Sequence, residues 1–267
     1  MKKRVLSAAI MLAVFIPLLI IGGKPFSIFM AILSVGGLYE LLKLRETKKE
    51  FPFIMKVFAY ILVLFFSLNN FTSIDFEYNL DYRAMSFIIF MFLIPIIFIN
   101  DSKKYNINDA LFLVGSILFI GLSFNLVIIT RNYDISYIIY ILLITCITDT
   151  FALFTGSLIG RHKMAPEISP KKTYEGLFGG LLAGVVTAVV YYHVIINPSL
   201  PLSILVLITL GLAVLGQIGD LVFSAIKRYY GVKDFSNIIP GHGGILDRLD
   251  SIIFVILGSI LVLGIIF

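Results

Sequence analysis

The amino-acid sequence predicts an all-α, polytopic integral membrane protein with about nine transmembrane helices and a site at the cytoplasmic interface. The chain of 267 residues is 59% hydrophobic and only 14% charged, whereas a soluble domain carries about a quarter charged residues. Its mean hydropathy is +1.02. Apolar runs that approach the ~20 residues of a membrane-spanning helix also recur from one end of the chain to the other.

The expected spans follow these apolar runs in order. They cover residues 5–21, 26–42, 53–68, 84–99, 110–129, 136–159, 176–196, 202–216 and 251–267. The first run could be a signal peptide, but no small-residue cleavage site follows it, so we interpret it as an uncleaved span. The run that begins at Leu202 is short, although helical sequence continues past it to Tyr230.

The basic residues predict the orientation of these spans. With a cytoplasmic N-terminus, eighteen of the 21 Lys and Arg residues fall inside, and only Lys24, Arg83 and Arg131 fall outside. The positive-inside rule therefore favours a cytoplasmic N-terminus in the cell (inner) membrane, with the C-terminus outside. The net charge of +5 is explained by topology and anionic head groups, so we expect no nucleic-acid partner. The single Cys146 excludes a disulfide framework and a cysteine metal site.

Asp149 is the first charged residue within an expected span. It lies thirteen residues after Ser136, about 20 Å along the helix, which places it in the cytoplasmic half of the bilayer. An ionisable group there is a functional candidate. Gly156 and Gly160 follow on roughly the same face and allow another helix or a ligand to approach. The alternative is a structural aspartate bonded to a neighbouring hydroxyl such as Thr145.

The segment from Ser169 to Glu175 is the second candidate. Ser169-Pro170 is typical of a turn, and the next helix begins near Thr173 and Glu175. A helix N-terminus attracts anions, so Lys171 and Lys172 beside it predict a phosphate site. The alternative is a basic loop that only sets topology.

The third candidate runs from Gln217 to Ser251. Asp220, Ser224 and Lys227 share one face of a helix that Gly231 can end. Asp247 and Asp250 share a face at the mouth of the last span, at about the same depth. These carboxylates suit a divalent cation, and the neighbouring cations suit phosphate. The alternative for the acids is ion pairing, for example with Arg248.

This stretch resembles the C-terminal signature of the phosphatidate cytidylyltransferases, which reads S-x-x-K-R, then K-D, then P-G-H-G-G-x-x-D-R-x-D. The matching residues are Ser224, Lys227, Arg228, Lys233, Asp234, Pro240, Gly241, His242, Gly243, Gly244, Asp247, Arg248 and Asp250. The segment after Asp149 is similar to the family's D-x-x-A-x-x-x-G, although residues 157–159 lack its usual basic ending. The S-P-K-K-T-x-E-G motif is matched in full from Ser169 to Gly176.

The resemblance implies that the cytidylyl group of CTP is transferred to phosphatidic acid, giving CDP-diacylglycerol and pyrophosphate at the cytoplasmic face. We expect Mg²⁺ as cofactor, with a second cation left open, and leave a homodimer open as well. The expected catalytic residues are Asp220, Asp247, Asp250, Lys227 and Arg228. The expected substrate-binding residues are Ser169, Lys171, Lys172, Thr173, Glu175, Ser224, Lys233, Asp234, His242, Gly243, Gly244 and Arg248. The expected metal ligands are Asp149, Asp220, Asp247 and Asp250.

We divide the chain into N-terminal transmembrane helices (1–135) and C-terminal catalytic helices with their cytoplasmic loops (136–267). His242 lies between glycines, and we expect it to form hydrogen bonds rather than to bind metal, since magnesium prefers oxygen ligands. Two other classes stay open. A transporter or channel would also bury Asp149 and Asp220, and another lipid-phosphate transferase would share the metal and the membrane.

Overall fold

The computed structural model describes residues 2–69, 82–99 and 101–262. The chain folds into two compact units. Unit 1 comprises Met1–Tyr133 together with the segment Phe235–Ile245, and unit 2 comprises Asp134–Asp234 together with Leu246–Phe267. The predicted boundary after residue 135 lies next to the end of unit 1, but the segment 235–245 belongs with the N-terminal helices.

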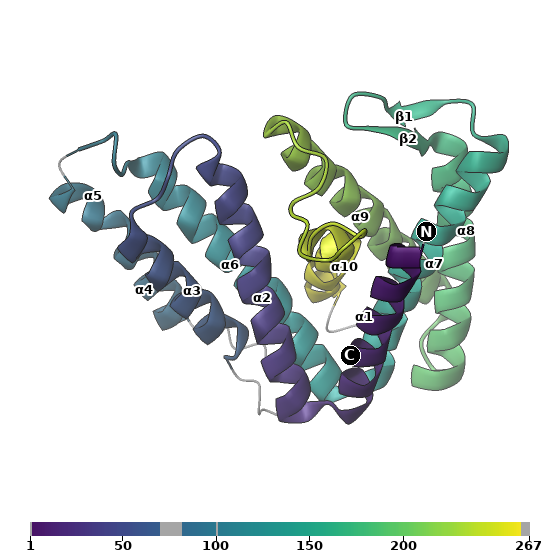
Figure 1. Cartoon of the computed structure of the whole chain (residues 1–267). Coiled ribbons are helices and arrows are strands. Elements are labelled where there is room, and N and C mark those ends of the chain that lie inside the picture. The colour runs from purple at the N-terminus through teal and green to yellow at the C-terminus, as the bar shows by residue number, and fades with distance from the viewer. Residues whose placement is uncertain (1, 70–81, 100, 263–267) are drawn as a thin grey trace. The chain divides into compact units, whose positions relative to one another are not determined.

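Unit 1 is helical throughout its described elements (Figure 1). Its helices are α1 (Lys2–Ile21), α2 (Gly23–Glu46), α3 (Phe53–Ser67), α4 (Tyr82–Leu93), α5 (Pro95–Phe98) and α6 (Ile107–Tyr133). Helices α2, α3 and α6 pack against one another. Because lipid tails are as apolar as leucine, such helices associate through close packing and hydrogen bonds rather than through the hydrophobic effect. A buried bond of 2.8 Å from Ser67 Oγ to Ser34 Oγ joins α3 to α2 in this way.

A buried carboxylate ties the end of α2 to the start of α6. Asp109 is 1% exposed, accepts a hydrogen bond of 3.0 Å from Arg45 and forms an ion pair with Lys49. It also accepts from the backbone N–H of Asn106 at 3.1 Å. Two of the basic residues that predicted the topology therefore also stabilise the fold. Burial, reinforced by nearby Asp109, raises the pKa of the neighbouring Tyr105 hydroxyl above its usual value.

Unit 2 contains the remaining helices and a small antiparallel hairpin (Figure 1). Its elements are α7 (Ile135–Ile159), β1 (Lys163–Ala165), β2 (Ser169–Thr173), α8 (Tyr174–Tyr191), a π-helical turn (Tyr192–Ile196), α9 (Leu202–Tyr229), α10 (Leu246–Ser259) and a 3₁₀ turn (Ile260–Val262). As predicted, α9 continues well past its apolar part, and Gly231 follows its end with a φ of 72°. That left-handed conformation is one that glycine adopts without strain.

Helices α7 and α8 approach each other closely because small residues line their contact. A Cβ atom on Gly180 would collide with the backbone of Thr148 and with Ala152, and one on Gly184 would collide with the Thr148 side chain. The glycine at 156 likewise faces Gly176, as the expected close approach required. Small residues at these positions let the two backbones pack directly, as in other membrane helix pairs. A bond of 2.7 Å between the hydroxyls of Tyr140 and Thr209 joins α7 to α9.

The hairpin corrects one sequence prediction. Ser169-Pro170, expected to form a turn, begins strand β2, and the turn lies at residues 166–168. The register pairs Lys163 with Thr173 and Ala165 with Ser169. Proline lacks an N–H to donate, but both strands of a two-stranded sheet are edge strands, where it is tolerated. The chain is therefore predominantly α-helical, with this one hairpin among the residues described.

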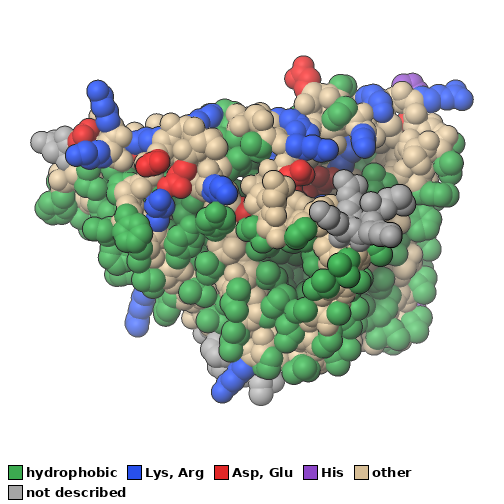
Figure 2. Space-filling model, in the orientation of Figure 1, with side chains coloured by type: hydrophobic (Ala, Val, Ile, Leu, Met, Phe, Trp, Pro, Cys, Tyr) green, Lys and Arg blue, Asp and Glu red, His purple; other side chains and the backbone are tan. Residues whose placement is uncertain are grey.

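Five helices are long and apolar enough to cross a membrane. They are Gly23–Glu46, Ile107–Tyr133, Ile135–Ile159, Tyr174–Ile196 and Leu202–Tyr229. Shorter apolar helices cover Val5–Ile21, Phe53–Ser67 and Tyr82–Phe98. Exposed apolar side chains such as Phe154, Phe178 and Leu182 lie on the outside of unit 2. At the right of Figure 2, hydrophobic side chains cover the flank of these helices, and basic side chains gather at the end that carries the hairpin. The described helices are those of an integral membrane protein; the end of the ninth expected span, residues 263–267, and the orientation of the C-terminus lie outside the described residues.

Candidate active site

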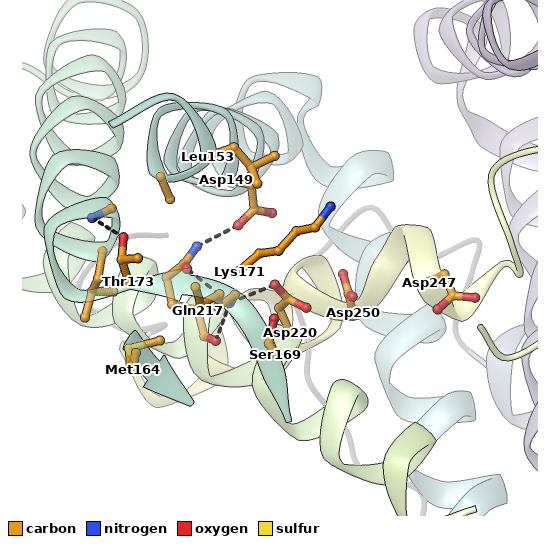
Figure 3. A pocket seen from close by; sticks show the side chains of 14 residues that line it. Asp149, Leu153, Met164, Ser169, Lys171, Thr173, Gln217, Asp220, Asp247 and Asp250 are labelled. Carbon is orange, nitrogen blue, oxygen red and sulfur yellow. Dashed lines mark hydrogen bonds and ion pairs between the residues drawn. The ribbon is translucent and has the colours of Figure 1, made fainter. Parts of the chain in front are cut away.

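A cavity of about 330 Å³ opens in unit 2 among α7, the hairpin, α8, α9 and α10 (Figure 3). That volume is in the range of small-molecule sites. The residues that line it are Asp149, Ala152, Leu153, Met164, Ser169, Lys171, Lys172, Thr173, Gly176, Leu177, Gln217, Asp220, Asp247 and Asp250. One part of the lining is apolar, and the other combines four carboxylates with two lysines.

Asp149 lies on α7 and bonds to two other helices of the unit. Its Oδ1 accepts 2.6 Å from Gln217 Nε2 on α9, and its Oδ2 accepts 3.1 Å from Ser251 Oγ on α10. The alternative of a bond to Thr145 is wrong in its partner, because that hydroxyl donates to backbone carbonyls of its own helix. Asp149 therefore joins three helices, and Figure 3 shows its bond to Gln217 at the wall of the cavity.

Gln217 connects the acid to a lysine. Its side chain is 4% exposed, and its Oε1 accepts 3.2 Å from Lys172 Nζ while its Nε2 donates to Asp149. A carboxylate only accepts and an ammonium only donates, so these two partners fix the orientation of the amide. Lys172 also donates 3.3 Å to the Gln217 carbonyl.

Lys172 continues the chain of contacts to a second carboxylate. Its Nζ stands 2.7 Å from Asp220 Oδ2, with the lysine side chain 17% exposed and that of Asp220 29% exposed. Ser224, one turn further along α9, is buried and donates 3.4 Å to Asp220 Oδ1. The helical spacing that predicted this shared face is confirmed for these two residues.

Asp247 and Asp250 come from the first turns of α10. Lys227 Nζ stands 2.6 Å from Asp247 Oδ1, and both side chains are nearly buried, at 10% and 3% exposed. Asp250 accepts 2.8 Å from the backbone N–H of Ser251. The ion-pair alternative therefore holds for Asp220, with Lys172, and for Asp247, with Lys227.

The hairpin places its basic residues next to the N-terminus of α8. Thr173 caps that helix by accepting 3.1 Å from the Gly176 N–H, so the helix begins where the sequence predicted. Lys171 is exposed and lines the cavity. Glu175 does not line it; its carboxylate accepts from the backbone N–H of His162 at 3.2 Å and lies 2.6 Å from the ring nitrogen Nδ1. Glu175 thus closes the base of the hairpin.

Several other predicted residues lie outside the cavity lining. Arg228 donates to the carbonyls of Ile168 at 3.2 Å and Val232 at 2.9 Å. Lys233, Asp234 and Arg248 are exposed. Their roles stay predictions. His242, Gly243 and Gly244 belong to unit 1, in the segment 235–245.

The carboxylate oxygens of the cavity are the kind of ligand that a hard cation prefers, but the side chains are not spaced closely enough to form a complete metal site by themselves. Within residues 2–69, 82–99 and 101–262, no three His, Cys, Asp or Glu side chains gather closely enough to hold a metal ion. Magnesium, however, is usually bound by one or two carboxylates and completes its shell with water and substrate phosphates. Asp149, Asp220, Asp247 and Asp250 offer such carboxylates around one cavity. The residues present are therefore compatible with magnesium once substrate supplies the remaining oxygens.

Comparison with known proteins bears on the whole chain. The model of the cytidylyltransferase family matches residues 2–266. The chain belongs to the cytidylyltransferase family. Curated relatives named phosphatidate cytidylyltransferase include one from Staphylococcus haemolyticus, 36% identical over 260 residues, which are 96% of this chain and 96% of the relative. Those from Bacillus subtilis and Staphylococcus aureus strain COL are 36% and 37% identical, over 96% of this chain and 94% and 96% of their own.

The sequence motifs did not identify two buried polar residues, Gln217 and Glu40, as functional candidates. Gln217 ends an apolar run, and nothing in its neighbours in sequence indicates which groups it will join. Glu40 lies inside the expected span 26–42 and is fully buried. Glu40 carries the same signal as Asp149, because it is an ionisable residue within an expected span and is therefore a functional candidate.

Proposed function

We propose that this chain transfers the cytidylyl group of CTP to phosphatidic acid, giving CDP-diacylglycerol and pyrophosphate. The observation that carries the proposal is the cavity of unit 2, which combines four aspartates and two lysines with an apolar wall. A nucleotide triphosphate needs cationic partners, and a lipid substrate needs an apolar surface next to its phosphate. The names of the relatives in the family support the same reaction.

The reaction itself asks for positioning and charge compensation. An oxygen of the lipid phosphate attacks the α-phosphorus of CTP, and the new P–O bond forms as the bond to the β-phosphate breaks. Pyrophosphate leaves with the electron pair of that bond. A phosphate monoester is largely ionised at neutral pH, as the second pKa near 6 of phosphorylated side chains indicates, so no strong general base is required. Lys171 and Lys172, which line the cavity, hold phosphate oxygens and offset the charge that develops.

The second basic pair has a different place in the proposal. Lys227 keeps the buried Asp247 carboxylate in position at the cavity edge, and Arg228, Lys233 and Arg248 supply positive charge to incoming substrate. His242, Gly243 and Gly244 bind substrate from their loop, as the resemblance implies. Lys172 lies beside the other paired carboxylate, with its Nζ 2.7 Å from Asp220 Oδ2.

Magnesium is part of the proposal. Asp149, Asp220, Asp247 and Asp250 would hold it, with a second cation left open. When bound, the cation neutralises the triphosphate and stabilises the departing pyrophosphate. In the structure, Gln217 and Ser251 orient the Asp149 carboxylate at the wall of the cavity.

The membrane placement completes the proposal. The chain spans the cell (inner) membrane about nine times, with a cytoplasmic N-terminus and a cytoplasmic site, which CTP can reach directly. Reporter fusions after each expected span test this arrangement, and a cytoplasmic reporter at Phe267 would contradict the nine-span count.

The decisive assay uses purified protein in lipid–detergent micelles. Each of the four nucleoside triphosphates is offered with and without phosphatidic acid, and both pyrophosphate and the lipid product are measured. With CTP we expect pyrophosphate and CDP-diacylglycerol in equal amounts, and only when phosphatidic acid is present; the other three nucleoside triphosphates should give neither. Any turnover of dCTP, offered separately, would give dCDP-diacylglycerol. Turnover with a polyprenyl phosphate in place of phosphatidic acid would favour another lipid-phosphate transferase. Solute flux into vesicles without CTP turnover would favour a transporter.

A further inference from the structure

The segment Phe235–Ile245 of unit 1 forms a tight loop that carries the P-G-H-G-G sequence. Within it, the Ile239 N–H donates 2.9 Å to the Gly243 carbonyl, and the His242 N–H donates 2.9 Å to the Ile239 carbonyl. Gly241 and Gly243 have φ values of 79° and 86°, which glycine adopts without strain. The loop therefore has one defined conformation, and contacts with other parts of unit 1 are needed to hold it in place.

Glu40 on α2 binds the loop at both ends. Its Oε1 accepts 2.6 Å from the hydroxyl of Ser236, near the start, and 2.8 Å from the backbone N–H of Ile245, the last residue. The side chain is fully buried. One carboxylate oxygen on a membrane helix thus joins two points that are nine residues apart in the loop.

The surroundings of Glu40 are shaped for this contact. A Cβ atom on Gly244 would collide with the Glu40 carboxylate, and one on Gly36, a turn earlier on α2, would collide with the Ile245 side chain. The loop therefore lies close against α2 at two places, where a Cβ atom would displace the Ile245 or Glu40 side chain. On the other side, the Ser7 hydroxyl of α1 shares a hydrogen bond of 2.8 Å with His242 Nδ1.

An apolar residue would be the less costly choice for this position. Burying an ionisable group within a membrane helix is unfavourable, and such groups in spans usually have a function. We infer that Glu40 is a positioning residue, whose carboxylate holds the P-G-H-G-G loop in its substrate-binding conformation. The inference rests on the proposed function, in which this loop binds substrate.

Amide hydrogen exchange of the full-length protein tests the contact directly. Glu40→Leu removes the acceptor, so the amides of Ile239, His242 and Ile245 should exchange roughly tenfold faster or more, the equivalent of one lost hydrogen bond to a charged group. Glu40→Gln retains a carbonyl oxygen at the same place and should keep exchange close to that of the wild type. Asp109→Asn is the matched control, since it changes another buried acid of unit 1 and should leave the loop unaffected.

Steady-state kinetics then separates positioning from simple stability. For Glu40→Leu we expect the KM for at least one substrate to rise roughly tenfold or more, with a smaller change in kcat and with recovery in Glu40→Gln. If Glu40→Leu does not fold, Ser236→Ala removes a hydroxyl donor to Glu40 from the loop side and should still raise both loop exchange and KM, by roughly threefold.

Two results would overturn the inference. Unchanged loop exchange in a folded Glu40→Leu protein, or in Ser236→Ala where Glu40→Leu does not fold, would mean that Glu40 does not hold the loop. Faster exchange with unchanged KM and kcat would mean that the held conformation is irrelevant to substrate. A wild-type protein that turns over no CTP would instead defeat the proposed function, and the exchange experiment would still report on the loop.

Discussion

Both units bury acids within or beside apolar helices, but they use them differently. In unit 1, Asp109 and Glu40 are 1% and 0% exposed and accept hydrogen bonds from nearby parts of the same unit. In unit 2, Asp149 and Asp220 line a cavity, and Asp220 remains 29% exposed even with Lys172 beside it. An acid enclosed by protein donors stabilises a conformation, whereas an acid at a cavity wall can also meet a ligand. In the sequence, each of these acids is simply a carboxylate in or beside an apolar run. Only the surroundings in the structure separate the acids that stabilise a conformation from those that can meet a ligand.

The largest effect should come from the cavity. Asp220→Asn keeps the shape of the side chain but removes the charge that faces Lys172 and the proposed cation. A bound metal contributes several kcal/mol to stabilising the transition state, so we expect kcat/KM to fall roughly a thousandfold. The measurement is CDP-diacylglycerol formation across a magnesium titration. A folded Asp220→Asn protein with normal turnover and unchanged magnesium dependence would remove Asp220 from the site.

A smaller effect should follow from the residue that joins the two sides of the cavity. Gln217→Leu preserves much of the volume but deprives Asp149 and Lys172 of one partner each. Losing hydrogen bonds to charged groups costs about 1.5–3 kcal/mol, so kcat/KM should fall roughly ten- to hundredfold. Gln217→Glu should be worse, because it sets a second carboxylate against Asp149.

The matched control for Gln217 lies on the same helix. Thr209→Val removes the bond to Tyr140, far along α9 from the cavity lining, and should lower thermal stability without changing KM. If Gln217→Leu, like Thr209→Val, lowered only thermal stability, the Gln217 amide would have a purely structural role. The contrast between the two units would then weaken.

The sequence was a good guide wherever spacing along one helix decides the outcome. The shared face of Asp220 and Ser224 followed from i, i+4 helix spacing, and a helix start near Thr173 was expected from the sequence. The structure confirms both. Charge within an apolar run was enough to select Asp149. These features depend only on residues that are close together in the sequence, so they can be predicted without knowing the tertiary structure.

Contacts between distant segments could not be predicted in the same way. Ser169-Pro170 begins a strand because residues 163–165 are available to pair with it, and no local rule contains that partner. Gln217 joins Asp149 and Lys172 across 68 and 45 residues of sequence. Glu40 reaches Ile245 across 205. For such polar residues the choice of partner is made by tertiary packing, and the sequence indicates only that a buried polar group needs one.

The smallest effect on activity should come from a substitution of Asp109, which tests the comparison between the two units with an acid of unit 1. Asp109→Asn retains an acceptor for the Asn106 N–H but leaves the partly buried Arg45 and Lys49 without their counter-charge. We expect a loss of about 1.5–3 kcal/mol in stability, seen as a lower thermal unfolding midpoint, with kcat and KM within roughly twofold of the wild type, the scale of a few tenths of a kcal/mol. Because Asp109 accepts from donors of its own unit and is not among the residues that line the cavity of unit 2, its loss has no direct route to the proposed substrate site. A tenfold fall in kcat at an unchanged unfolding midpoint would show that an acid outside the cavity lining can serve catalysis, and position at the cavity would then no longer separate the two kinds of carboxylate.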